Sequence, residues 1–88
     1  MTERTVKVVN SLGIHARPAS LIVQTAMKHK SSIQLIKDEV PADAKSIMSV
    51  MMLAASVNTS VVIRAEGEDE KEAVDSIAAL FEKKFNEE

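Results

Sequence analysis

The spacing of the apolar residues changes repeatedly along this chain, and that series of changes constrains the fold more than any other feature. Alternation around Val6 predicts a half-buried strand over Thr5–Val9. From Ala16 to Lys28 the apolar residues instead recur every three or four positions, which predicts a helix. Both periods return downstream, so we expect one domain, residues 1–88, with the element order β-α-β-β-α-β-α.

The first predicted helix has a defined start and one apolar stripe. Pro18 fits only in the first helical turn, where its missing N–H costs no hydrogen bond, so the helix must begin close to it. The residues predicted to face the core are Ala19, Ile22, Val23, Ala26 and Met27.

Three further strands are predicted, at Ile33–Leu35, at Val40–Ala42 and at residues 61–66. Pro41 cannot donate a hydrogen bond to a neighbouring strand, so the middle one should lie at a sheet edge. Turns are expected at residues 38–39 and 58–59, and Gly67 ends the last strand. One face of that strand carries Val61, Ile63 and Ala65.

A second helix is predicted over Ile47–Ala55, with Ser46 as its N-cap. It carries two apolar lines, and a short helix rarely buries both against one sheet. The line expected to be buried is Ile47, Val50, Leu53 and Ala54, and Met52 is also compatible with the core. The line rotated away from it is Met48, Met51 and Ala55.

The last helix is predicted from a capping-box-like pair, Asp69 and Glu72, and Lys83 and Lys84 suit its C-terminal end. Its predicted buried residues are Ala73, Val74, Ile77, Ala78, Phe81 and Phe85. Mixed element order with short strands predicts an α+β fold with helices on one face of a mostly antiparallel sheet. The periodicity leaves a ferredoxin-like strand order and other split arrangements open.

The composition excludes several classes of protein. Without cysteine the chain has no disulfide scaffold and no thiolate metal site, and its two histidines lie too far apart in sequence to suggest another metal site. Without Trp or Tyr, stacking on nucleic-acid bases is not expected. No apolar run approaches membrane-spanning length and no signal peptide is evident, so we expect a cytoplasmic protein. We also expect it to have no cofactor.

The charges are distributed unevenly. Residues 66–88 hold nine acidic and three basic residues, a net charge of −6, whereas residues 1–65 hold eight basic and four acidic residues, a net charge of +4. This mild positive excess suits attraction to an acidic protein surface better than it suits duplex DNA. Scattered solvated charges explain the same numbers.

The segment Gly13–Pro18 is the strongest candidate for chemistry. His15 falls near the N-cap of the first helix, where unpaired N–H groups favour an anion, and Arg17 offers a planar set of donors that matches phosphate oxygens. A neutral imidazole beside such donors can accept and return a phosphoryl group. A solvated or capping histidine fits the pattern too, and His29, at the other end of this helix, is expected to be structural or solvated.

Two segments together decide between these interpretations. Residues 12–19, Leu-Gly-Ile-His-Ala-Arg-Pro-Ala, resemble the active-site segment of HPr, the histidine-containing phosphocarrier family of the bacterial phosphotransferase system. Residues 45–51, Lys-Ser-Ile-Met-Ser-Val-Met, resemble the segment around that family's regulatory serine, at the matching separation. The resemblance implies an open-faced β-sandwich with strand order 1-4-2-3 and three helices on one face.

The resemblance also implies roles and partners. His15 would carry the phosphoryl group on Nδ1, Arg17 would balance its charge, and Ser46 would be the target of a regulatory kinase. Ile47, Met48 and Met51 would form a docking surface. The implied partners are Enzyme I as donor, Enzyme II A domains as acceptors, the HPr kinase/phosphorylase and a transcriptional regulator; the protein itself would be a monomeric relay and not an enzyme.

This sequence departs from the family pattern where Glu39 and Ser49 replace frequent glycines, and where residues 56–59 lack one, although Asn58 tolerates a left-handed conformation. The tail that contains Phe81 and Phe85 is similar to the nitrogen-regulatory branch.

One alternative is a regulatory HPr-like protein that acts through binding, but such relatives lack the active histidine. Another is an unrelated small α/β interaction domain. For Ser46 the alternative is a cap alone, and for Met48 and Met51 it is filling of core gaps.

Overall fold

A computed structural model describes residues 1–86 and confirms the predicted element order. Glu87 and Glu88, which contribute to the acidic charge count, lie outside the described residues. The elements are β1 (Thr2–Lys7), α1 (Ala16–Ala26), β2 (Ser32–Lys37), β3 (Val40–Asp43), α2 (Ile47–Met52), β4 (Ser60–Glu66), α3 (Glu70–Glu82) and a 3₁₀ turn, η1 (Lys84–Asn86).

The four strands form one antiparallel sheet in the order β1-β4-β2-β3. This confirms the order that the family resemblance implied and settles what periodicity alone left open. β4 pairs with β1 on one side, Val6 opposite Val61, and with β2 on the other, Leu35 opposite Ile63. β3 lies at the edge, as the proline at position 41 predicts.

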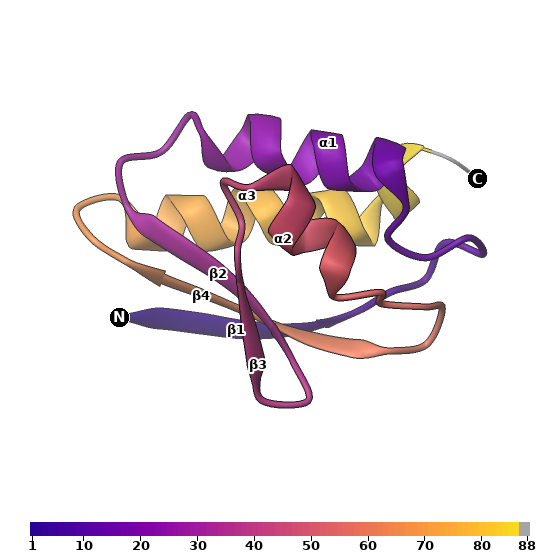
Figure 1. Cartoon of the computed structure of the whole chain (residues 1–88). Coiled ribbons are helices and arrows are strands. Elements are labelled where there is room, and N and C mark those ends of the chain that lie inside the picture. Colours follow the sequence, from indigo (N-terminus) through magenta and orange to yellow (C-terminus); the bar gives the residue numbers. More distant parts are fainter. Residues whose placement is uncertain (87–88) are drawn as a thin grey trace.

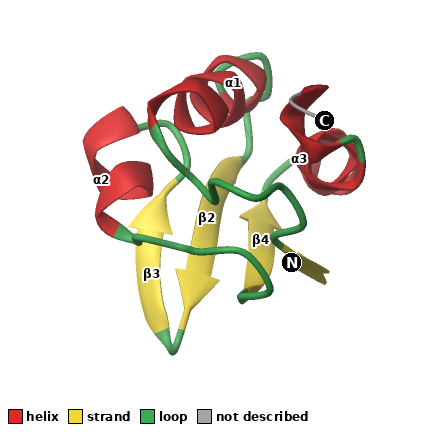
Figure 2. Cartoon of the chain, turned by 90° about the vertical axis from the view of Figure 1, so that its right-hand side faces the viewer, coloured by secondary structure: helices red, strands yellow, loops and turns green. Residues whose placement is uncertain are grey.

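The helices cover one face of the sheet and leave the other open (Figures 1 and 2). α1 and α3 run side by side, α3 contacts β1, β4 and β2, and the shorter α2 contacts β3. Every side chain predicted to be buried in the last helix is buried, including Phe85, which lies beyond the end of α3 in η1. The rings of Phe81 and Phe85 meet edge to face, with their centroids 4.9 Å apart, and close the core beneath the end of α3.

The first strand starts and ends earlier than predicted. β1 covers Thr2–Lys7 and not Thr5–Val9, because the polar residues at its start pair with the end of β4 even though their side chains are largely exposed. Val8 is fully buried, but it lies after the strand. Its backbone is bonded to the loop before β4, since its N–H donates to Thr59 O (2.9 Å) and its carbonyl accepts from Asn58 (2.7 Å).

The prediction that Met27 is buried was wrong. α1 ends at Ala26 and not at Lys28, and Met27 is its C-cap, with 64% of its surface exposed. The chain turns there through a hydrogen bond from the N–H of Lys28 to Thr25 O (3.1 Å), which carries Met27 away from the core. Of the remaining predicted stripe, Val23 is half-buried and the other three residues are fully buried.

α2 is also shorter than predicted, ending at Met52 instead of Ala55. The cause is Ala54, whose φ of 50° is left-handed and ends the helix. For a residue other than glycine, this conformation costs roughly 1–2 kcal/mol of free energy. Asn58 (φ 73°) adopts the left-handed conformation that the sequence allowed for it.

The buried apolar residues in and after α2 differ from the predicted buried line. Val50 and Leu53 are buried as predicted, but Ile47 is 42% exposed and Ala54 is exposed, so half of the predicted buried line was wrong. Ala55, assigned to the outer line, is buried, and Met52, compatible with the core in the sequence, is 80% exposed.

The turn between β2 and β3 forms without glycine. Asp38 (φ 50°) and Glu39 (φ 67°) are both left-handed, which is the conformation of a tight two-residue hairpin. The turn predicted at these two residues is therefore confirmed, and the glycine that is frequent in the family at position 39 is not required for it.

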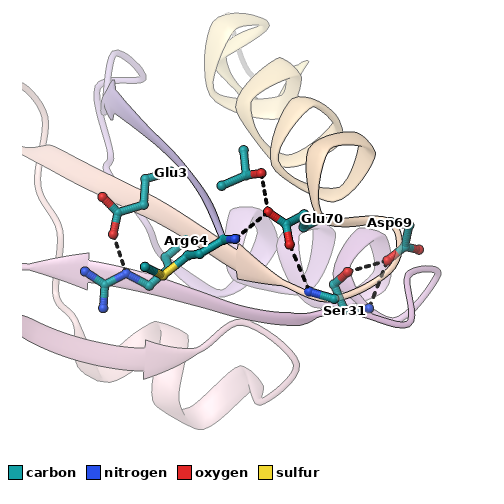
Figure 3. Close-up of polar contacts among 8 residues, drawn as sticks. Glu3, Ser31, Arg64, Asp69 and Glu70 are labelled. Atoms are coloured by element: carbon teal, nitrogen blue, oxygen red, sulfur yellow. Dashed lines mark hydrogen bonds and ion pairs between the residues drawn. The ribbon is translucent and has the colours of Figure 1, made fainter.

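Asp69 does not form the predicted capping box with Glu72. Its side chain makes no capping hydrogen bond to α3 and instead binds the loop before β2 (Figure 3). It accepts hydrogen bonds from the Ser31 hydroxyl (2.5 Å), the Ser31 N–H (2.9 Å) and the Lys30 N–H (3.1 Å), and His29 Nδ1 lies 3.3 Å away. The carboxylate thus ties the start of α3 to a segment far away in the sequence.

The neighbouring Glu70 performs a similar role at the start of the sheet. It accepts hydrogen bonds from the Thr2 hydroxyl (2.6 Å) and the Gly67 N–H (3.2 Å), and it pairs with the Met1 amino group at 2.9 Å (Figure 3). The Thr2 hydroxyl and these other donors lower the pKa of Glu70 to about 2. Hydrogen bonds from Ser31, above all from its hydroxyl, likewise lower the pKa of Asp69.

We predict that Asp69→Asn lowers the melting temperature at pH 7 and flattens its acid dependence. Because the pKa of Asp69 lies below its ordinary value of 3.8, the carboxylate stabilises the fold above about pH 4, and this contribution is lost as the pH falls toward the lowered value. Thermal melts between pH 2 and pH 7 measure both effects, with the exposed carboxylate Glu68→Gln as control. Equal melting curves for the two variants would contradict the prediction.

Candidate functional site

His15 is the N-cap residue of α1, as predicted. Its backbone is extended (φ −97°, ψ −167°), its side chain is half-buried, and that side chain does not cap the helix. The first N–H groups of a helix lack intrahelical partners, and here they belong to Ala16 and Arg17, because Pro18 has none. His15 therefore lies next to these backbone donors in the chain, at the positive end of an 11-residue helix.

The loop before His15 is held by its own backbone and by Asn10. The Asn10 side chain is fully buried, and its Nδ2 donates to Gly13 O at 2.7 Å. The N–H of Gly13 donates in turn to Asn10 O at 3.1 Å. No role was predicted for Asn10 from the sequence; the available signal was an asparagine three residues before a glycine, a common turn pattern.

The same loop rests on the segment that follows α2. The N–H of Ile14 donates to Ala55 O at 2.8 Å. Gly13 has a φ of 70°, and a Cβ built on it would lie 2.5 Å from Ala55 O. Only glycine fits here, because both the backbone angle and the contact with another backbone exclude a side chain. In Figure 1 these two loops lie together at one end of the molecule.

Arg17 lies in the first turn of α1 and is exposed. It is the one charged residue within the helix Ala16–Ala26, and α2 (Ile47–Met52) has none. Both helices therefore lack acidic side chains. The end of the molecule that carries His15 is suited to an anion.

Ser46 is the N-cap of α2, as predicted. Its hydroxyl oxygen accepts a hydrogen bond from the Ser49 N–H at 3.3 Å, and the residue is half-buried. Ser49, where the family frequently has glycine, thus supplies the N–H that the cap requires.

The three side chains that the family resemblance implied as a docking surface are exposed. The exposed fractions are 72% for Met48, 44% for Met51 and 42% for Ile47. Core filling by Met48 and Met51, the alternative considered for them, is therefore wrong. We call Ile47, Met48 and Met51 the α2 apolar patch, and Met52 extends it.

His29 lies away from this region, against Asp69, with 13% of its side chain exposed. Within residues 1–86 no cluster of three or more histidine, aspartate or glutamate side chains could hold a metal ion. No helix in the same residues has the length and apolar character to cross a membrane.

Sequence analysis missed Lys37 altogether. Its Nζ donates to Leu53 O (2.9 Å) and Ala54 O (3.3 Å), at the C-terminal end of α2. No sequence pattern indicated this contact, because it joins the end of β2 to a helix end whose position depends on the left-handed Ala54.

This combination of an open sheet, three covering helices and a histidine at a helix start defines a class of small phosphocarrier proteins. The chain belongs to the PTS-HPr family, whose model, described as the PTS HPr component phosphorylation site, matches residues 2–83. The family inferred from the two sequence segments is confirmed.

Individual proteins agree with the family assignment. The phosphocarrier protein HPr of Treponema pallidum is 47% identical over 88 residues, the full length of both chains. The HPr-C-His crystal structure from Thermoanaerobacter tengcongensis superposes with a TM-score of 0.96 at 48% identity, covering 100% of this chain and 99% of that one. The HPr-like protein Crh of Bacillus subtilis is 44% identical over 82 residues, 93% of this chain and 96% of Crh.

Membership of this family has general consequences. HPr proteins are phosphocarriers of the phosphotransferase system and are generally not enzymes, and their partners are other components of that system. The regulatory, Crh-like alternative is not favoured.

Proposed function

We propose that this chain accepts a phosphoryl group on His15 Nδ1 from phospho-Enzyme I, charged by phosphoenolpyruvate, and passes it to the A domains of Enzyme II in sugar uptake. The observation that carries the proposal is the position of His15 as the N-cap of α1, in a family described by its phosphorylation site. The chain would act as a cytoplasmic, monomeric relay with no cofactor of its own.

The surroundings of His15 suit transient binding of a phosphoryl group. The backbone N–H groups at the start of α1 and the guanidinium of Arg17 can donate to its oxygens. As the new P–N bond forms on Nδ1, the bond from phosphorus to the donor protein breaks. In the second transfer, a bond from phosphorus to the acceptor protein forms as the P–N bond to His15 breaks, and Nδ1 regains its free electron pair. Because the site is a half-exposed helix end and not a deep pocket, the group stays accessible to the next protein.

The α2 apolar patch (Ile47, Met48 and Met51) supports a role in docking. Exposed methionines are flexible and polarizable, and such side chains can fit several different partner surfaces. The absence of acidic residues from α1 and α2 would also favour acidic partner surfaces. Both Enzyme I and Enzyme II A domains would use this region.

We predict that incubation with Enzyme I and phosphoenolpyruvate places one acid-labile phosphoryl group on the protein. Intact mass and phosphorus NMR should show it in the wild type and in His29→Ala, the matched control, but not in His15→Ala. A base-labile, acid-stable ester, or labelling that survives His15→Ala, would contradict the assignment.

The kinetics of the same reaction test Arg17. A charge-assisted hydrogen bond is worth about 1.5–3 kcal/mol, so Arg17→Glu should slow transfer roughly 10–150-fold. Lys71→Glu makes the same charge change at an exposed site on α3 and should leave the rate unchanged. A rate for Arg17→Glu within twofold of wild type would show that Arg17 is a bystander.

We predict that Met48→Ala combined with Met51→Ala lowers stability by less than about 1.5 kcal/mol, because truncation of exposed side chains costs little. The same pair should weaken binding to Enzyme I and to an Enzyme II A domain at least about fivefold, since apolar anchors dominate interface energies. Denaturant unfolding and calorimetric titration measure the two effects.

Met27→Ala is the control for this double variant, since Met27 is similarly exposed at the opposite end of α1 from His15. It should leave both affinities unchanged. Unchanged affinities for the double variant would remove the α2 apolar patch from the docking surface.

We also propose that phosphorylation of Ser46 by the HPr kinase/phosphorylase regulates the carrier, with a transcriptional regulator as a further partner. Aspartate and asparagine both cap helices well, so Ser46→Asp and Ser46→Asn should each retain the melting temperature. Only Ser46→Asp, which adds negative charge next to the α2 apolar patch, should slow transfer from Enzyme I. Equal rates for the two variants would leave Ser46 with a capping role alone.

A further inference from the structure

The side chain of Lys37, in strand β2, binds the backbone at the C-terminal end of α2. Lys37 is the last residue of β2, it is half-buried, and its Nζ donates to Leu53 O at 2.9 Å and to Ala54 O at 3.3 Å. The last carbonyls of a helix have no intrahelical partners, so an ammonium group satisfies them well.

The two carbonyls that Lys37 binds belong to the two peptide planes that flank the Cα atom of Ala54. The relative orientation of those planes is set by the backbone angles of Ala54, which is left-handed at φ 50°. Alanine adopts this conformation reluctantly, whereas glycine adopts it freely. By holding both carbonyls on one ammonium group, Lys37 stabilises the conformation that alanine alone disfavours.

The next residue, Ala55, supports the loop that carries His15. Its carbonyl accepts the Ile14 N–H at 2.8 Å, and Gly13 approaches the same oxygen so closely that a Cβ would lie 2.5 Å from it. These are contacts between backbones with no flexible side chain to absorb a displacement. A change in the angles of Ala54 would therefore move the Ala55 carbonyl and, with it, the residue that precedes His15.

We propose that Lys37 is a positioning residue for phosphoryl transfer, acting through Ala54 and Ala55 to fix the backbone on which the His15 loop rests. The inference deepens the proposed function and depends on it for its kinetic consequence. The hydrogen bonds of Lys37 go to Leu53 O and Ala54 O and not to His15 or the α2 apolar patch. Its effect on His15 would therefore be indirect, through the backbone that follows α2.

The test is a set of Lys37 and Ala54 variants assayed for transfer from Enzyme I. Lys37→Met keeps the aliphatic stem and removes the charge, and it should lower kcat about tenfold while KM changes less than twofold, because misplacement of a reacting group affects the chemical step. Lys37→Arg, which retains a cation, should keep most of the activity. Lys71→Met removes one exposed positive charge from α3 and should have no effect.

Rescue by glycine separates positioning from direct contact with a partner. Adding Ala54→Gly to Lys37→Met should restore kcat to within about twofold of wild type, because glycine adopts the left-handed angle without the lysine. An unchanged kcat in Lys37→Met, an effect on KM alone, or failure of Ala54→Gly to rescue would each overturn the proposal. If Lys37→Met does not fold, the milder Lys37→Gln is compared with and without Ala54→Gly against the same criteria.

NMR spectra of the unphosphorylated variants make the result independent of the proposed function. The Ile14 amide and the His15 ring signals should shift in Lys37→Met and return toward wild-type positions when Ala54→Gly is added. If the wild type accepts no phosphoryl group, the proposed function fails, and these signals still decide the positioning role. Signals that stay unshifted in Lys37→Met would overturn it even if transfer were slowed.

Discussion

Strand β4 is the element on which the rest of the molecule is assembled. It pairs with β1 on one side and β2 on the other, and it turns Val61, Ile63 and Ala65 into the core shared with α3. Burial of a valine or isoleucine side chain contributes roughly 1.5–3 kcal/mol, so the start of β4 is firmly held. The loop before it is further bonded through Thr59 to the backbone of Val8, two residues before Asn10.

The candidate site is built mainly from backbone groups. The His15 loop is fixed by the approach of Gly13 to Ala55 O and by the buried side chain of Asn10, while His15 itself stays at the edge of the molecule. This arrangement separates two requirements. The loop before His15 is held by backbone contacts and by the Asn10 side chain, while the half-exposed His15 remains accessible to a partner protein. A relay needs both, because it must meet a donor and an acceptor in turn.

Local signals made much of the fold predictable. The missing N–H of Pro18 placed the start of α1, and with it His15 as the N-cap, while the periodicity of residues 70–85 identified every buried side chain of α3. The failures have a different origin. Met27, Ala55 and Asp69 were misplaced because each depends on a backbone turn or on a partner distant in sequence. A glycine often indicates a left-handed residue at the end of a helix, but an alanine such as Ala54 does not. The end of α2 could therefore not be predicted from the sequence.

The uneven charge distribution also has a structural explanation. Several carboxylates in the acidic segment are engaged within the fold: Asp69 binds the loop before β2, Glu70 binds the start of β1, and Glu82 pairs with Arg4 at 2.9 Å. The ion pair between Glu82 and Arg4 is exposed and contributes little to stability. It nevertheless holds the negative charge of Glu82 next to β1. α3 carries four acidic side chains, whereas α1 and α2 carry none, so the start of α1 with His15 and Arg17 is compatible with a doubly charged phosphoryl group.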